Sequence, residues 1–306
     1  MIEKITSNKL TWLDITNPTR EDLAFLSEKY KFHDLDLEDC LSKVQRPKIE
    51  DYEEYTFLVL HFPVMQPRGY RLSIEEVDIF WGDDYVITLH SRNFSKISEI
   101  FDNVEKNKDL LKKYFSDDSD YLLYEVLHEV ALSIFPIMNR ISKEIDVLDN
   151  SFDTLKPLKL IERISALRRN IIFLQTSFKP NKNIFAILEN QFEAQEEKGM
   201  DVYWGDIGDY IGKLMDMAED YQELIDGLYS SIDTLLTYRT NSIIKTLTIF
   251  SVIMLPLTFI TGFYGMNIRL PFQEEFAHSY ESVLVVSGIM ALIAIGMLIY
   301  FKIKRF

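Results

Sequence analysis

Four residues that close the first long apolar stretch of the chain, Tyr264, Gly265, Met266 and Asn267, have types that suit contact with a hydrated cation. A membrane-spanning helix that ends here frees backbone carbonyl oxygens, and glycine permits a sharp turn. Asn267 adds a neutral amide oxygen. Neutral oxygens can hydrogen-bond the water shell of a cation, and they do not trap the ion. The alternative is an ordinary helix C-cap.

Two stretches, residues 243–264 and 283–301, are long enough to cross a bilayer, for which about 20 apolar residues suffice. The first contains one charged residue, Lys245, and the second contains none. Arg269 is the only Lys or Arg between them, whereas their other ends carry Arg239, Lys245, Lys302, Lys304 and Arg305. The distribution of basic residues therefore predicts an outer loop and two cytoplasmic termini.

One face of the first apolar stretch is a candidate pore lining. Counting back from Asn267 in steps of three and four residues defines that face. It comprises Asn241, Ile244, Leu247, Ser251, Leu255, Thr258 and Gly262. Polar rings would bracket apolar rings, which can gate a pore by dewetting. No acid or His lies within either stretch, which favours passive flux over proton coupling. The alternative is that Leu247 and Leu255 face lipid.

The charge of the chain is unevenly distributed. Of 48 acids and 33 bases, three acids and five bases follow Ser242, leaving 45 acids and 28 bases, a net charge of -17, in the first 242 residues. So negative a region argues against a nucleic-acid partner and is compatible with concentrating cations, although acidity can also serve solubility alone. Cys40 is the only cysteine, which fits a reducing compartment. The first residues show no signal-peptide core, so we expect that the amino-terminal domain is not exported.

Residues 11–115 predict an α/β region. Strands are expected at residues 12–15 and 55–64, a hairpin at 76–80 and 85–89, and helices at 20–30 and 97–106. After Asp120 the pattern is helical: a helix up to Lys156-Pro157, a second at 158–178 and a shorter one at 184–197, together an antiparallel hairpin.

A third helical region runs from about Met200 without a proline until Pro256. Its near-heptad apolar stripe predicts packing against copies of the same chain. A signalling coiled coil would give a similar stripe. The stripe comprises Leu214, Met217, Tyr221, Leu224, Leu228, Ile232 and Leu235.

Six motifs, spread from the first fifth of the chain to its end, resemble those of CorA magnesium transporters in their order. They are Gln45-Arg46-Pro47-Lys48-Ile49-Glu50, Asp120-Tyr121-Leu122-Leu123-Tyr124, Tyr238-Arg239-Thr240-Asn241, Leu255-Pro256-Leu257-Thr258-Phe259-Ile260, Tyr264-Gly265-Met266-Asn267 and Ile299-Tyr300-Phe301-Lys302. The resemblance implies a homopentamer in which α/β domains form a funnel around five long stalk helices. It also implies that the first spans line the pore and that Gly265-Met266-Asn267 form its selectivity filter.

The resemblance further implies that cytoplasmic Mg²⁺, bound between neighbouring subunits, holds the funnel closed. The matching residues are Asp39 and, from the adjacent chain, Asp206, with Glu38 near a second site. Divalent ions would screen carboxylates that otherwise repel across the interface. The alternative is that Asp39 and Asp206 are solvated surface acids. His128 lies near where relatives carry an acid of the second site, which weakens the case for that site, and Ser230 replaces an acidic stalk ring.

The sequence therefore predicts an α+β membrane protein: a cytoplasmic α/β domain, then long helices, with two transmembrane helices at the C-terminus, in a homopentameric funnel. The expected domains are residues 1–119 (α/β), 120–199 (helical hairpin), 200–264 (stalk and first span), 265–282 (outer loop) and 283–306 (second span and basic tail).

The expected function is that of a Mg²⁺ channel in the inner cell membrane, with Co²⁺ or Ni²⁺ as secondary substrates. We expect regulatory Mg²⁺ but no organic cofactor, and no enzyme activity. Two alternatives stay open. One is a Zn²⁺ transporter of the same superfamily, with or without proton coupling, a subgroup that tends to vary the residue at Met266. The other is a membrane-anchored sensor with a coiled-coil stalk.

Overall fold

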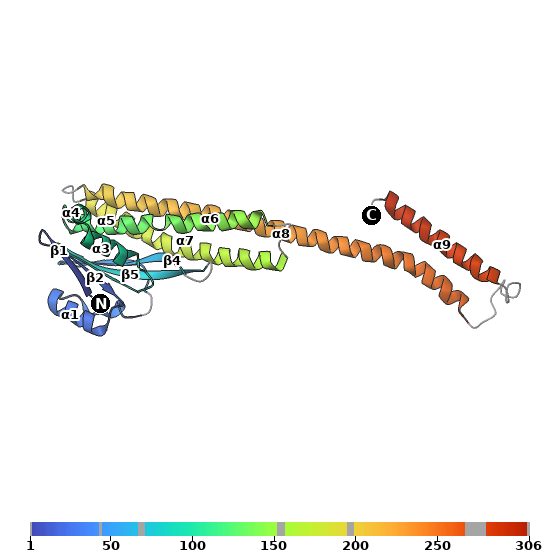
Figure 1. The fold of residues 1–306 in the computed structure, drawn as a ribbon, viewed down its shortest axis with the longest axis horizontal. Helices are drawn as coiled ribbons and strands as arrows, with labels where there is room; N and C mark the ends of the chain where they lie inside the picture. The colour runs from blue at the N-terminus through green and yellow to red at the C-terminus, as the bar shows by residue number, and fades with distance from the viewer. Residues whose placement is uncertain are drawn as a thin grey trace. The chain divides into compact units, whose positions relative to one another are not determined.

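The computed structural model divides into two compact units, Met1–Tyr229 and Ser230–Phe306 (Figure 1). The structure describes residues 2–42, 45–66, 71–151, 157–194, 199–266 and 280–304. The helix α8 contributes its first part to the first unit and the remainder to the second.

A six-stranded sheet in the order β1-β2-β6-β5-β4-β3 forms the centre of the first unit. The strands are β1 (Ile2–Ser7), β2 (Leu10–Thr16), β3 (Lys48–Asp51), β4 (Thr56–Met65), β5 (Leu72–Gly82) and β6 (Tyr85–His90). Neighbours are antiparallel except β2 and β6, which are parallel. The predicted hairpin between β5 and β6 and the predicted strands in β2 and β4 are confirmed, whereas β1 and β3 were not predicted.

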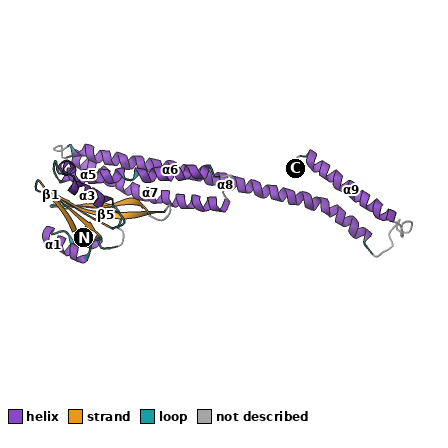
Figure 2. Cartoon of the chain, viewed as in Figure 1, coloured by secondary structure: helices purple, strands orange, loops and turns teal. Residues whose placement is uncertain are grey.

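Helices cover both faces of the sheet (Figure 2). On one face lie α1 (Arg20–Tyr30) and α2 (Asp34–Asp39), whose Leu26 and Leu37 join a buried cluster with Phe57 and Phe80 of the strands. The helix α1 begins where the sequence predicts, because Thr19 and Asp22 cap each other's backbone N–H groups. The other face is covered by α3 (Lys96–Lys106), α5 (Ser119–Leu132) and α7 (Pro157–Glu193), while α4 (Lys108–Tyr114) packs on α3 and α5.

Two helix predictions are wrong. The helix predicted up to Lys156-Pro157 is interrupted after Leu132, and α6 (Phe135–Asp149) begins anew with Pro136 in its first turn, where a missing N–H costs nothing. The break predicted between residues 178 and 184 does not exist, because α7 continues through Pro180. A proline inside a helix removes one hydrogen bond, so the continuity of α7 must come from its tertiary contacts.

Buried polar side chains of α7 supply those contacts. The pairing of β3 with β4 extends only as far as Val59 of β4. At His61, further along β4, the ladder between β3 and β4 has ended, and this edge of β4 is left for other partners. Asn181 accepts from the His61 backbone N–H at 3.3 Å and donates to its carbonyl oxygen at 2.7 Å, and Ser177 donates to the same oxygen at 2.7 Å. Asn170 likewise accepts from the N–H of Leu72 at 3.1 Å. The helix therefore completes the hydrogen bonding of the sheet.

The predicted antiparallel pairing of helices is present in α6 and α7, which pack side by side with an ion pair of 2.9 Å between Glu144 and Arg163 (Figure 1). The apolar stripe of α8 (Met200–Tyr264) is divided: Leu214 and Tyr221 are buried within the chain, whereas Leu224 and Leu235 are about half exposed. Packing of the exposed part against other copies stays a prediction.

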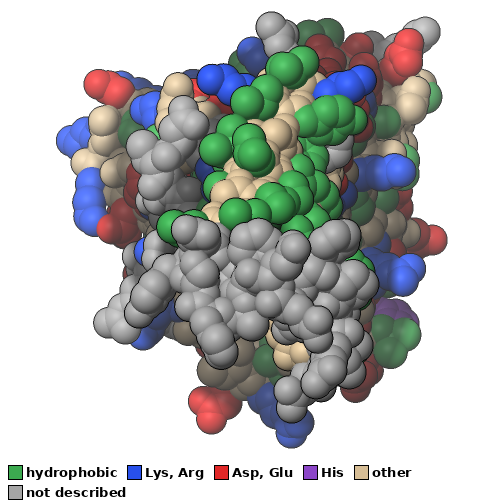
Figure 3. Space-filling model, turned by 90° about the vertical axis from the view of Figure 1, so that its right-hand side faces the viewer, with side chains coloured by type: hydrophobic (Ala, Val, Ile, Leu, Met, Phe, Trp, Pro, Cys, Tyr) green, Lys and Arg blue, Asp and Glu red, His purple; other side chains and the backbone are tan. Residues whose placement is uncertain are grey.

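Three described stretches are long and apolar enough to cross a membrane: Ser119–Asp149, Met200–Tyr264 and Val283–Ile303 of α9 (Tyr280–Ile303). The most apolar segment of the first stretch is 56% buried inside the structure, whereas the corresponding segments of α8 and α9 are 0% buried. Figure 3 shows hydrophobic side chains gathered on an exposed surface of the molecule. Apolar surface of this extent is not stable in water. A bilayer would cover it, as the prediction of two membrane spans requires.

Candidate functional site

The turn after α8 explains the glycine of the predicted filter. The N–H of Gly265 donates to the carbonyl oxygen of Thr261 at 2.9 Å, and the N–H of Met266 donates to Phe263 at 3.3 Å. A Cβ atom on Gly265 would lie 2.9 Å from the Thr261 oxygen, a distance that forces the backbone to move. Gly265 and Met266 are exposed. Asn267, the predicted source of the amide oxygen, lies outside the described residues.

The predicted pore face of α8 is exposed along its whole length. Its members share this exposure with most neighbouring residues of the helix: Asn241, Ile244, Leu247, Ser251, Leu255, Thr258 and Gly262. The Thr258 hydroxyl proton points toward the backbone of its own helix, because the side chain donates to the Met254 carbonyl oxygen at 2.8 Å. The lone pairs of the hydroxyl oxygen are thereby left to accept from other donors, such as water molecules around a cation.

Asp39, the first predicted regulatory acid, lies at the end of α2. Its Oδ2 accepts from the Lys48 ammonium at 2.9 Å, and Lys48 also donates to Glu50 at 3.0 Å. The Asp39 side chain is 27% exposed and that of Glu38 is exposed on the same short helix. Asp36 of α2, by contrast, is buried and accepts from Tyr55 at 2.8 Å, and burial raises its pKa. Asp39 and Glu38 therefore remain accessible, whereas Asp36 is structural.

Asp206, the second predicted acid, lies on α8 in the first unit. Tyr124 of α5 donates to its Oδ2 at 3.2 Å, and His128 Nε2 lies 3.8 Å from the same oxygen. Burial, followed by the charge of Asp206, raises the pKa of Tyr124, which therefore acts as a donor. The Asp206 side chain is 42% exposed. The structure thus places His128, predicted near the second site, directly beside Asp206.

Asp39 and Asp206 belong to separate clusters within one chain. Among the described residues, no group of three or more His, Cys, Asp or Glu side chains could hold a metal ion. Both carboxylates are partly exposed, and each accepts a hydrogen bond from a side chain of its own chain.

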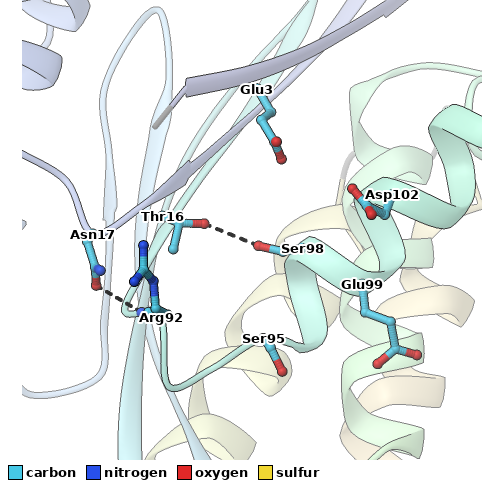
Figure 4. Close-up of a pocket in the computed structure, with 8 residues that line it drawn as sticks. All are labelled: Glu3, Thr16, Asn17, Arg92, Ser95, Ser98, Glu99 and Asp102. Atoms are coloured by element: carbon cyan, nitrogen blue, oxygen red, sulfur yellow. Dashed lines mark hydrogen bonds between the residues drawn. The ribbon is translucent and has the colours of Figure 1, made fainter.

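A surface pocket lies beside α3 (Figure 4), and a buried polar network lies next to it. Thr16 and Ser98, whose hydroxyl oxygens lie 3.2 Å apart, border both. Beneath them, Ser98 donates to Asp14 at 3.0 Å, and His90 Nε2 lies 3.2 Å from Asp14 and 3.3 Å from Ser98. A hydrolytic triad requires Ser and Asp on opposite ring nitrogens. Here both contact Nε2, while Nδ1 faces the Ser91 carbonyl at 2.8 Å, so the network is structural.

The charge of His90 depends on this network. Burial lowers the pKa of His90, but the hydrogen bond and charge of Asp14 outweigh burial, and the net shift is upward. Both side chains are 0% exposed. This set of Ser, His and Asp was not predicted, because its members come from α3, β6 and β2, and no local spacing connects them.

Two partners of the predicted site residues were also missed. Lys48 and Tyr124 both lie within motifs that resemble those of CorA transporters. Only the tertiary contacts show that Lys48 donates to Asp39 and that Tyr124 donates to Asp206. Two sequence signals for these partners were available. Lys48 and Glu50 alternate along a strand, and Tyr124 and His128 are one helical turn apart.

Comparisons with known proteins identify one family over nearly the whole chain. The family model described as "CorA-like Mg2+ transporter protein" matches residues 7–305. The "Cobalt/magnesium transport protein CorA" of Thermotoga maritima is 30% identical over 304 residues, which cover 98% of this chain and 84% of that protein.

Solved structures show the same fold. The complete structure of the CorA magnesium transporter from Methanocaldococcus jannaschii matches with a TM-score of 0.83 at 22% identity, covering 98% of this chain and 93% of that one. The cytoplasmic domain of ZntB from Vibrio parahaemolyticus matches with a TM-score of 0.62 at 13% identity, covering 75% and 88%. The family match over nearly all residues and the relative at 30% identity lead to one conclusion: the chain belongs to the CorA-like Mg²⁺ transporter family.

Proposed function

We propose that the protein transports hydrated divalent cations, mainly Mg²⁺ with Co²⁺ and Ni²⁺ as secondary substrates, through a pore formed by several copies of the chain. The observation that carries this proposal is the family match from residue 7 to residue 305, which includes both exposed apolar helices and the residues between them. A homopentamer is the assembly that the resemblance to CorA magnesium transporters implies.

The chemistry of α8 supports a passage for ions that keep their water. Mg²⁺ binds water tightly, so a pore that removes the water must replace a complete octahedral shell. Neutral oxygens such as those of Asn267 and Thr258 can instead accept hydrogen bonds from the bound water. The apolar spans contain no acid that would hold the ion, and release is as necessary for conduction as binding. Leu247 and Leu255 would form apolar constrictions between the polar positions.

We further propose that residues 1–242 are cytoplasmic, that the second part of α8 and α9 cross the inner membrane, and that both termini are inside. Basic residues at the inner ends of the spans support this orientation. The proposed domains remain residues 1–119, 120–199, 200–264, 265–282 and 283–306.

Regulation by the transported ion is the second part of the proposal. Asp39 of one copy and Asp206 of the next would bind a cytoplasmic Mg²⁺ ion and hold the assembly closed, and Glu38 would lie near a second ion. Both acids are partly exposed, which leaves their carboxylates open to a shared ion. When Mg²⁺ leaves, mutual repulsion of the carboxylates would favour opening.

Flux into liposomes tests the transport proposal. Purified full-length protein is reconstituted with a Mg²⁺-sensitive dye inside, and Zn²⁺ and Co²⁺ serve as comparators. We expect Mg²⁺ entry without dissipation of a pH gradient, and no entry in Asn267→Ala, whose assembly should stay intact. The matched control, Asn190→Ala, removes an exposed amide from α7 and should transport normally.

Two results of this assay would contradict the proposal. Normal uptake by Asn267→Ala would remove the filter assignment. Zn²⁺ entry that dissipates a pH gradient, in place of Mg²⁺ entry, would establish the zinc alternative instead.

A further inference from the structure

The short strand β3 holds a lysine in front of α2. Side chains alternate along a strand, so Lys48 and Glu50 point to the same face. In the register with β4, Lys48 is opposite Val59 and Glu50 is opposite Phe57. The Lys48 ammonium lies 5.2 Å from the centre of the Phe57 ring, a favourable contact that fixes its direction. The fold thus positions this ammonium beside the end of α2.

The ammonium bridges two carboxylates from different elements. It lies 2.9 Å from Asp39 Oδ2 of α2 and 3.0 Å from Glu50 Oε1 of β3. Two carboxylates at hydrogen-bond distance favour the charged form of the Lys48 side chain. The ammonium therefore keeps its charge at physiological pH, and one lone-pair position of Asp39 is occupied by a cation that belongs to the chain.

The Lys48 ammonium balances part of the negative charge of the acidic side chains around it. The pocket at the end of α2 is lined by Leu35, Asp36, Asp39, Lys48, Glu50, Asp51 and Tyr52, so four carboxyl groups share it with one ammonium. Behind it Asp78 is 5% exposed, and its Oδ1 has no hydrogen-bond partner among the described residues.

We propose that Lys48 is a built-in competitor of the regulatory divalent cation, and that it sets the Mg²⁺ concentration at which the protein closes. This inference rests on the proposed role of Asp39. A hydrated Mg²⁺ ion donates hydrogen bonds from its water to carboxylate oxygens, and the Lys48 ammonium donates to the same oxygen. An ion whose water binds Asp39 Oδ2 must displace the ammonium from that oxygen, and the ammonium can retain its bond to Glu50 when it leaves Asp39.

The competition has a predictable size. The Lys48 and Asp39 side chains are 28% and 27% exposed, so their pairing is partly screened by solvent. Removing the ammonium should lower the half-closing Mg²⁺ concentration about five-fold, which corresponds to about 1 kcal/mol at ten-fold per 1.4 kcal/mol. A larger effect would require a fully buried pair.

The test measures flux through full-length protein in liposomes as a function of Mg²⁺ on the cytoplasmic side. Lys48→Met should close at about five-fold lower Mg²⁺, whereas Lys48→Arg, which keeps the charge, should stay within about two-fold of the wild type. Lys96→Met is the matched control, because Lys96 is 27% exposed and pairs with Glu99 at 3.2 Å on α3. It should behave as the wild type.

A second measurement covers loss of stability in Lys48→Met, where acids around Asp39 lose their counter-charge. Thermal unfolding of the protein in detergent is recorded with and without Mg²⁺. Because Mg²⁺ replaces the missing charge, it should raise the melting temperature of Lys48→Met more than that of the wild type. Equal stabilisation in the two proteins would overturn the inference.

Asp39→Asn separates the two levels of the proposal. If Asp39→Asn shifts Mg²⁺ closure and Lys48→Met does not, the competition is wrong and the regulatory role of Asp39 stands. If neither variant shifts closure, the regulatory role of Asp39 is wrong, and the competition is excluded with it.

Discussion

Replacing Asn181 with alanine tests how strongly the sheet depends on the polar side chains of α7. Asn181 is 0% exposed, and it bonds both backbone groups of His61, accepting from the N–H at 3.3 Å and donating to the carbonyl oxygen at 2.7 Å. The carbonyl oxygen keeps a second donor, Ser177, at 2.7 Å. In Asn181→Ala the N–H therefore loses its side-chain partner, while the carbonyl oxygen loses one of two.

The magnitude follows from these two losses. A buried N–H without a partner costs about 1–3 kcal/mol, and a lost bond to an oxygen that keeps another partner costs about 0.5–1.5 kcal/mol. We therefore expect the free energy of unfolding of the first unit to fall by about 2–4 kcal/mol. For a unit of this size each kcal/mol lowers the melting temperature by about 2–4 °C, so the expected decrease is about 5–15 °C.

The assay is thermal unfolding of the full-length protein in detergent, followed by circular dichroism. The matched control is Asn190→Ala, because Asn190 is exposed on the same helix and donates to Ala186 within its own turn. If Asn181→Ala melts within about 2 °C of this control, α7 does not complete the sheet in the way that the hydrogen bonds indicate.

Three further changes have defined outcomes. Gly265→Ala should reduce Mg²⁺ flux into liposomes at least about ten-fold, since its Cβ would lie 2.9 Å from the Thr261 oxygen; normal flux would show that the turn tolerates the side chain. Asp206→Ala should raise the half-closing Mg²⁺ concentration at least about five-fold in the same assay, and an unchanged block would remove its regulatory role. Because the folded state raises the pKa of His90, its pairing with Asp14 stabilises the protein fully below about pH 6.5 and is lost as pH rises through the folded-state pKa. The decrease in melting temperature from about pH 6 to pH 8.5 should therefore be smaller in His90→Gln, and an equal decrease would contradict the assignment.

Local signals were sufficient for several elements. The capping pair of Thr19 and Asp22 and the tight turn between Gly82 and Tyr85 involve neighbouring residues only, and α1 and the hairpin of β5 and β6 lie where they were predicted. The signals failed where distant residues decide. Pro180 predicts a break by itself, but Ser177 and Asn181 bond the sheet across more than 100 positions and hold the helix together.

The candidate site divides in the same way. Gly265 and Met266 follow the end of α8 as the sequence predicts, because an apolar run and a glycine are features of consecutive residues. The partners of the regulatory acids are different. Lys48 is nine positions from Asp39 and in another element, and Tyr124 is 82 positions from Asp206, so no pattern along the chain pairs them.

The sequence by itself determined the family, the two apolar stretches, the position of Gly265-Met266-Asn267 and the acidity of the first 242 residues, because each depends on the order and type of neighbouring residues. Only the tertiary structure decided which charges meet. It brought the Lys48 ammonium to Asp39. It also brought both Tyr124 and His128 to Asp206. The physical reason is that electrostatic and hydrogen-bond energies depend on distances of a few ångströms, which the packing of strands and helices sets.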